Sequence, residues 1–156
     1  KAITRRHHWR RVSPKQKGTN MIFDKQTLLS DAQAITATAA STNVIDLGPI
    51  KTGIVRDIGK GEPIPLLVQV VETFNTLTSL TIALQVDDAD TFGSPKTVWS
   101  TVVALADLKA GKVVVPEFIP RGTDERFMRL LYTVTGTAPT LGKITAGVTM
   151  GNQSNG

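Results

Sequence analysis

The residue types that most often carry catalysis are scarce in this chain. Its two histidines, His7 and His8, are adjacent in a basic N-terminal segment, and the sequence contains no cysteine. A serine–histidine–aspartate triad, a histidine-bearing metal site and a histidine general base are therefore excluded from the rest of the chain, as is a thiolate nucleophile. The composition predicts a protein that is not an enzyme and that uses no cofactor or metal.

Two short motifs superficially resemble ligand sites. Asp87, Asp88 and Asp90 have the spacing with which a calcium loop begins, but the glutamate and glycine that complete such a loop are missing. A solvated turn after a strand is the favoured interpretation, with a weak oxygen-ligand site as the alternative. The Gly-Lys-Gly of residues 59–61 lacks the spacing of a phosphate-binding loop and is followed by a proline instead of a helix, so we interpret it as a turn.

Sugar chemistry has little support in the sequence. A glycosidase needs two opposed carboxylates in a cleft, and no carboxylate here is paired with another at such a separation. Trp99 lies in a strand-like run and is expected to lie in the core. A carbohydrate-binding jelly roll stays open as an alternative, and it requires Trp99 or Tyr132 to be exposed.

The net charge of +5 is concentrated at one end of the 156-residue chain. Residues 1–20 hold seven basic and no acidic side chains, whereas the remainder holds eleven basic and thirteen acidic ones, a net −2. With few large apolar side chains, residues 1–20 are expected to be disordered. They are interpreted either as a leader ahead of a start at Met21 or as a basic arm that binds nucleic-acid phosphates. Residues 151–156 are expected to form a flexible polar tail.

From Met21 onward the sequence predicts strands, because amphipathic stretches of helix length are missing and Thr and Val are abundant. Residues 80–86 alternate strictly between apolar and smaller or polar side chains, as a half-buried strand does. The expected strands cover residues 34–39, 43–47, 64–74, 80–86, 97–103, 112–118, 126–134 and 143–150. Residues 104–111 suggest one helical turn, and residues 136–142 suggest a hairpin loop. The prediction is an all-β, jelly-roll-like antiparallel sandwich of about eight strands over residues 21–150, preceded by a flexible basic segment.

Three stretches resemble the Bbp16-like family of phage capsid cement proteins. They read MIFDKQTLLSDAQAITATAASTNVIDLG from residue 21, VRDIGKGEPIPLLVQV from residue 55 and FIPRGTDERFMRLLYTVTGTAPTLGKITAGV from residue 118. The resemblance implies a jelly roll that associates with itself on the outer surface of an HK97-like shell and locks neighbouring major capsid proteins together without covalent links. It implies a location in the virion after synthesis in the bacterial host cytoplasm, with no small-molecule substrate and no membrane.

Three groups of residues are candidates for contacts with the capsid or with a second copy. Residues 21–30 are expected to form either an arm that adds to a partner or an edge strand of the domain's own sheet. The loop at residues 53–63 has mixed charge, and three arginines lie near the seventh strand, where the alternative is a solvated sheet face paired with Asp124 and Glu125. The candidates are Ile22, Phe23, Leu28, Leu29, Arg56, Lys60, Arg121, Arg126 and Arg129.

Overall fold

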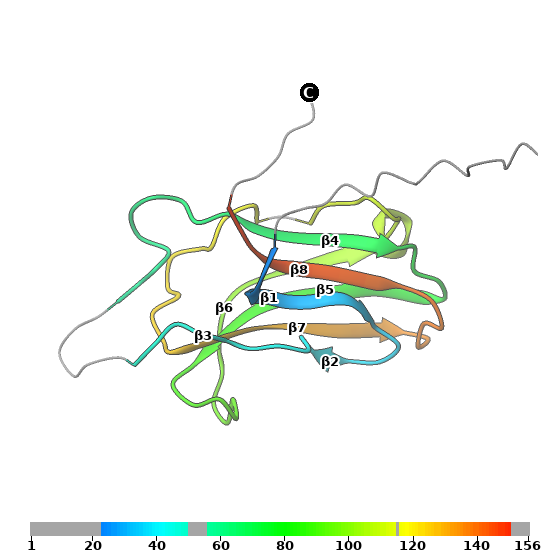
Figure 1. The fold of residues 1–156 in the computed structure, drawn as a ribbon. Coiled ribbons are helices and arrows are strands. Elements are labelled where there is room, and N and C mark those ends of the chain that lie inside the picture. Colours follow the sequence, from blue (N-terminus) through cyan, green and yellow to red (C-terminus); the bar gives the residue numbers. More distant parts are fainter. Residues whose placement is uncertain (1–22, 50–55, 115, 151–156) are drawn as a thin grey trace, which may run out of the picture.

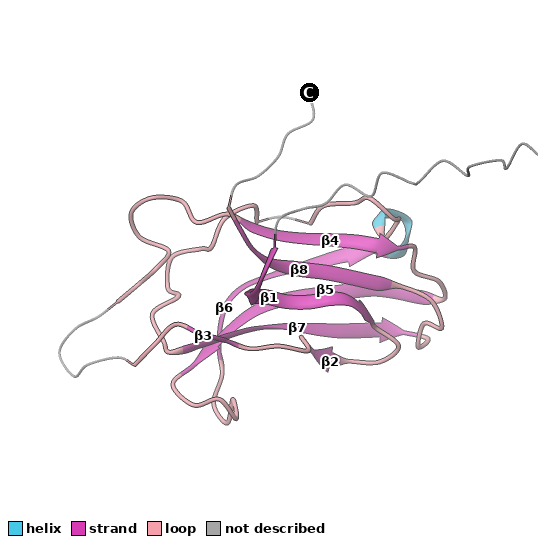
Figure 2. Ribbon diagram, viewed as in Figure 1, coloured by secondary structure: helices cyan, strands magenta, loops and turns pink. Residues whose placement is uncertain are grey.

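Two antiparallel sheets pack face to face in the computed structural model, which describes residues 23–49, 56–114 and 116–150 (Figures 1 and 2). One sheet has the strand order β1-β8-β4, and the other has the order β2-β7-β5-β6 with β3 also paired to β7. The strands are β1 (Phe23–Ala34), β2 (Ala39–Ala40), β3 (Ile45–Asp46), β4 (Leu66–Glu72), β5 (Leu77–Asp87), β6 (Lys96–Ala104), β7 (Phe127–Gly136) and β8 (Lys143–Thr149). The predicted all-β sandwich is confirmed.

The core lies between the sheets and follows from the period of two in the strands. On β5, the side chains of Leu80, Ile82 and Leu84 are fully buried, as the sequence alternation predicts. They face the buried residues Leu66, Val68 and Val70 of β4. Apolar side chains from the two inner faces fill the space between the sheets, as in other β-sandwiches.

The segment at residues 112–118 is not the strand that its valines predicted. It runs beside β4 and forms isolated bridges from Val113 to Gln69 and from Phe118 to Pro65. Pro116 lies inside this segment and has no backbone N–H to donate to a ladder. If this irregular segment is counted as a fourth strand beside β4, and residues 39–46 as one broken strand, the order becomes that of an eight-stranded jelly roll.

Two other local predictions are wrong because the chain crosses between sheets there. Residues 34–39 do not form one strand: β1 ends at Ala34, Ile35 turns into the core, and β2 begins in the other sheet at Ala39. Residues 136–142 do not close a hairpin, since β7 and β8 belong to different sheets. The strand predicted at residues 43–47 is reduced to β3.

The predicted helical turn is confirmed as a short 3-10 helix, η1 (Leu105–Asp107). Within the described ranges, no helix is long and apolar enough to span a membrane.

A buried hydrogen-bond network joins the two sheets. The hydroxyl of Tyr132 on β7, which is fully buried, lies 2.8 Å from the Ser30 hydroxyl on β1. Ser30 in turn donates to the Gln33 side-chain oxygen at 2.8 Å, so the Tyr132 hydroxyl is the donor toward Ser30. Gln33 also accepts the backbone N–H of Thr42 and donates to the Ala40 carbonyl. Because each buried polar group has a partner, this network fixes β1 against the opposite sheet.

Replacing Ser30 with alanine is expected to destabilise the fold by about 1–3 kcal/mol, because the buried Tyr132 hydroxyl would lose its acceptor. Tyr132→Phe, which removes that hydroxyl, should cost less, about 1 kcal/mol. Urea unfolding of the two single variants and the double variant would measure the coupling between them. Strictly additive effects would contradict the inter-sheet hydrogen bond.

Candidate interaction surface

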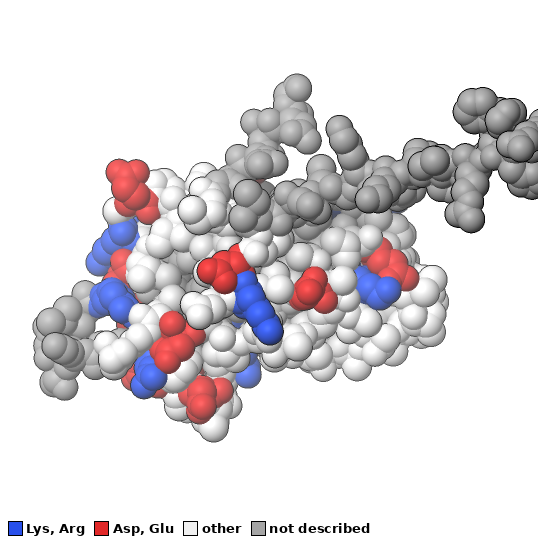
Figure 3. All heavy atoms as spheres, in the orientation of Figure 1, with Lys and Arg blue, Asp and Glu red and all other residues white. Residues whose placement is uncertain are grey.

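Charged side chains gather at one end of the sandwich, where β5 ends and where β6 and β7 begin (Figures 1 and 3). This end, which we call the loop end, comprises residues 46–49, 56–63, 87–96 and 118–127. Lysine and arginine side chains are interspersed there with aspartate and glutamate (Figure 3). Such a mixed surface is suited to binding another protein that has a matching pattern of charge.

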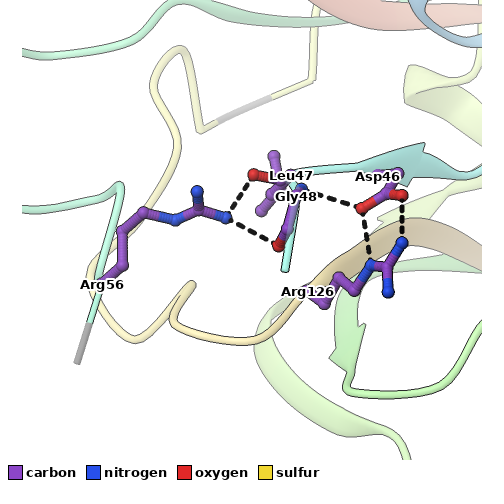
Figure 4. A network of polar contacts seen from close by, with 5 residues as sticks. All are labelled: Asp46, Leu47, Gly48, Arg56 and Arg126. Carbon is purple, nitrogen blue, oxygen red and sulfur yellow. Dashed lines mark hydrogen bonds and ion pairs between the residues drawn. The ribbon is translucent and has the colours of Figure 1, made fainter. Parts of the chain in front are cut away.

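The start of β7 is joined to β3 by an arginine–aspartate pair (Figure 4). Arg126 donates through Nε and Nη2 to the two carboxylate oxygens of Asp46, at 3.0 and 2.8 Å. The Gly48 backbone N–H also donates to Asp46, at 2.8 Å. The hydrogen bonds from Arg126 and Gly48 lower the pKa of Asp46 from 3.8 to about 2. Arg56 donates to the carbonyls of Leu47 and Gly48, so the guanidinium groups of both arginines are held within the chain.

A second aspartate holds two loops of this end against each other. The carboxylate of Asp57 accepts the backbone N–H groups of Gly59 and Gly122, each at 2.9 Å. Burial raises the pKa of Asp57, but these backbone hydrogen bonds outweigh it, so the pKa lies below its usual value. The two backbones are in close contact, because a Cβ on Gly59 would lie 2.0 Å from the Pro120 carbonyl oxygen. Asp57 therefore makes one rigid unit of residues 56–60 and 120–123.

Lys60 and Arg121 project from this unit. Both are exposed, and among the described residues neither side chain has a hydrogen-bond or ion-pair partner. Ile58 donates its N–H to the Thr123 carbonyl at 3.1 Å, and this bond also keeps the two loops together. The side chains of Lys60 and Arg121 are thus available for hydrogen bonds and ion pairs with a partner, and a rigid backbone presents them. The Lys60 charge also lowers the pKa of Asp57 through space.

Asp87 uses its carboxylate to shape its own loop. It accepts the backbone N–H groups of Ala89 and Ser94, both at 3.0 Å, and these hydrogen bonds lower its pKa. Its side chain is largely buried, as expected for a residue that organises a turn. In the part of the chain that the structure describes, no three metal-ligating side chains form a group that could hold an ion.

The arginines near β7 do not pair with the acids that were predicted for them. Asp124 pairs with Lys96 at 2.7 Å, and Arg126 pairs with Asp46 instead. The guanidinium of Arg129 stacks 4.0 Å from the centre of the Phe92 ring and donates to the Gln85 side chain at 3.0 Å. Arg126 and Arg129 are therefore mainly structural, which leaves Lys60 and Arg121 as the freer cations.

The apolar candidates at the start of the domain fall in the edge strand β1, which pairs with β8. For residues 23–30 the edge-strand interpretation is correct. Leu29 is fully buried in the core, so its prediction as a partner contact is wrong. Phe23 and Leu28 are partly buried, and the ring of Phe23 packs where a Cβ on Gly147 would lie. Ile22 lies outside the described residues.

Neither Tyr132 nor Trp99 stands exposed as a sugar platform would require. Tyr132 is fully buried, and Trp99 is partly buried and packs against the core, as predicted for Trp99. The predictions for residues 1–20 and 151–156 fall outside the described residues.

Sequence reasoning missed the structural roles of Asp46 and Asp57. A signal was present, because each aspartate is followed two residues later by glycine, in Asp46-Leu47-Gly48 and Asp57-Ile58-Gly59. In both, the glycine N–H donates to the aspartate Oδ1, the arrangement of an Asx turn.

Stability at acidic pH should depend on Asp46. Because its folded pKa is lower than its ordinary value of 3.8, the ion pair stabilises the fold above about pH 4, and this contribution is lost as the pH falls toward 2. Arg126→Met should return the pKa of Asp46 toward 3.8, whereas Arg121→Met should leave it unchanged. A carboxyl NMR titration would measure both values. An unchanged Asp46 pKa in Arg126→Met would rule out the ion pair.

The comparison with known families agrees with the sequence resemblance. A model of the Bbp16 family matches residues 29–148, which run from the middle of β1 to the end of β8 and include residues from every strand of both sheets. No curated protein matches the chain. The family match covers most of the sequence and all of the core strands. This chain belongs to the Bbp16 family.

Proposed function

We propose that this protein is a phage capsid cement protein. It binds the outer surface of an HK97-like shell of major capsid protein and stabilises that shell by bridging neighbouring subunits without covalent links. Membership of the Bbp16 family is the observation that carries the proposal, since it indicates a phage-related structural protein. In this proposal the protein acts in the virion and is not an enzyme. It uses no cofactor and binds neither a membrane nor a nucleic acid.

The loop end has the mechanical properties that such a role requires. A bridge between subunits transmits force through its contact loops, so loops that are ordered before binding lose less entropy on docking. Asp46, Asp57 and Asp87 each use carboxylate oxygens to accept backbone N–H groups within the loops. These hydrogen bonds support a contact surface that is already formed in the free protein.

Lys60 and Arg121 are the side chains that we expect to contact the capsid. They are exposed, they extend from the unit that Asp57 organises, and neither side chain forms a hydrogen bond or ion pair with a described residue. An acidic patch on the major capsid protein is the matching partner. Such charges at the rim of an interface act mainly on orientation and association rate.

Purified protein should bind stoichiometrically to phage heads that lack it, and the decorated heads should open at a higher temperature. Cosedimentation and a thermal release assay for the packaged DNA would measure the two effects. Failure to bind such heads would exclude the proposed function.

Reversing both free charges, in Lys60→Glu with Arg121→Glu, should weaken binding to heads about tenfold at low salt, with less effect at high salt. Lys109→Glu is the matched control, because Lys109 is exposed at the opposite end, next to η1 (Figure 2). Association kinetics on immobilised heads would show the change. Equal loss in the control and in the double variant would place the contact elsewhere.

A further inference from the structure

Strand β6 is an unprotected sheet edge. It has nine residues, from Lys96 to Ala104, and it lies at the end of its sheet, where β5 is its neighbour. From Trp99 to Ala104 it pairs with β5 residue by residue without interruption. Within the described part of the chain, its backbone groups that point away from β5 have no partner. A regular free edge of this kind is a template for a further strand.

The other edges are protected by devices that sheet proteins commonly use against pairing. Strand β1 has three interruptions in its register with β8 and carries charges at Asp24, Lys25 and Asp31. The segment beside β4 is irregular and contains Pro116. On the far side of the second sheet, β2 and β3 have two residues each. Bulges, charges, proline and short length all discourage strand addition, and β6 has one bulge at its Lys96 end and no proline.

The outer face at β6 is uncharged and partly apolar. Val102 is 66% exposed, the most exposed large apolar side chain in any described strand. Ser100 shares its face, because both residues alternate with the inward-facing Thr101 in the pairing with β5. The neighbouring positions on this face of β5 and β7 are Thr81, Ala83, Leu131 and Thr133. A charged strand would find no opposite charge here, whereas an uncharged strand rich in Val, Thr and Ser would fit.

We propose that β6 pairs antiparallel with β6 of a second copy, about a two-fold axis near Val102, so that two five-stranded sheets become one continuous sheet. Strand β6 is itself the kind of strand that its edge would accept, because residues 97–104 are uncharged. The charge of Lys96 is offset by Asp124 at 2.7 Å and lies at the end of the strand, away from the axis. A two-fold pairing therefore brings no unpaired like charges together. This inference deepens the proposed function by naming the surface through which the cement protein associates with itself.

Analytical ultracentrifugation of the full chain over a concentration series tests the pairing. The wild-type protein should form a dimer whose fraction rises with concentration. Val102→Lys should weaken the dimer at least tenfold, because like charges would meet near the axis. Mixing the Val102→Lys and Val102→Asp variants should restore a heterodimer. Ser100→Lys is a second variant on the same face, and circular dichroism checks that each variant is folded.

Leu141→Lys is the matched control, because Leu141 is also apolar and 53% exposed but lies in the loop between β7 and β8, not on β6. It should leave the dimer unchanged. A wild-type monomer at every concentration, or a dimer that Val102→Lys and Ser100→Lys leave intact, would overturn the pairing. The measurement uses free protein and is therefore independent of the test with heads. A protein that dimerises through β6 but does not bind heads would contradict the proposed function and leave the pairing intact.

Discussion

Backbone N–H groups that leave the ladders must find acceptors, and this constraint shapes the described structure outside its core. At the loop end the acceptors are the carboxylates of Asp46, Asp57 and Asp87. Between the sheets, the Ser30 hydroxyl accepts the Tyr132 hydroxyl, and the Gln33 side-chain oxygen accepts the Thr42 N–H from the turn before β3. Three separate aspartates thus supply in the loops the acceptors that cross-strand pairing supplies in the sheets.

The same constraint separates structural charges from charges that are free to act. A carboxylate that accepts a backbone N–H of its own loop is tied to that loop. An arginine bound to such a carboxylate shares that structural role, as Arg126 does through Asp46. Lys60 and Arg121 belong to the rigid unit by their backbones, but their side chains take no part in its hydrogen bonds. A count of charges therefore overstates how many cations can bind a partner. Of the five basic candidates, three have side-chain hydrogen bonds within the chain, and Lys60 and Arg121 do not.

The sequence predicted what local periodicity determines and failed where the chain changes sheets. The alternation of residues 80–86 located β5 because Leu80, Ile82 and Leu84 share the face that packs in the core. The alternation predicted a half-buried strand, whereas β5 is buried on both faces from Ile82 to Asp87. The crossings at Ile35 and at residues 136–142 have no local signal, because the sequence of a strand does not indicate which of the two sheets the strand joins. The partner of Arg126 lies 80 residues away in the sequence, so its pairing with Asp46 could not be predicted from spacing. The aspartate–glycine pattern of the Asx turns was a local signal and could have been used.

The two proposed surfaces fit one geometry for bridging. Strand β6 begins at the loop end, and its nine residues extend about 30 Å along the sheet. In an antiparallel β6 pair the two copies run in opposite directions, so their loop ends lie at opposite ends of the joined sheet. A dimer lying with its strands parallel to the shell would place Lys60 and Arg121 of each copy over a different capsid subunit. Non-covalent bridging then requires one weak docking contact at each end of the dimer. Once one end is bound, the other end is held at a high effective concentration near its own capsid subunit, so the dimer binds more tightly than either contact alone.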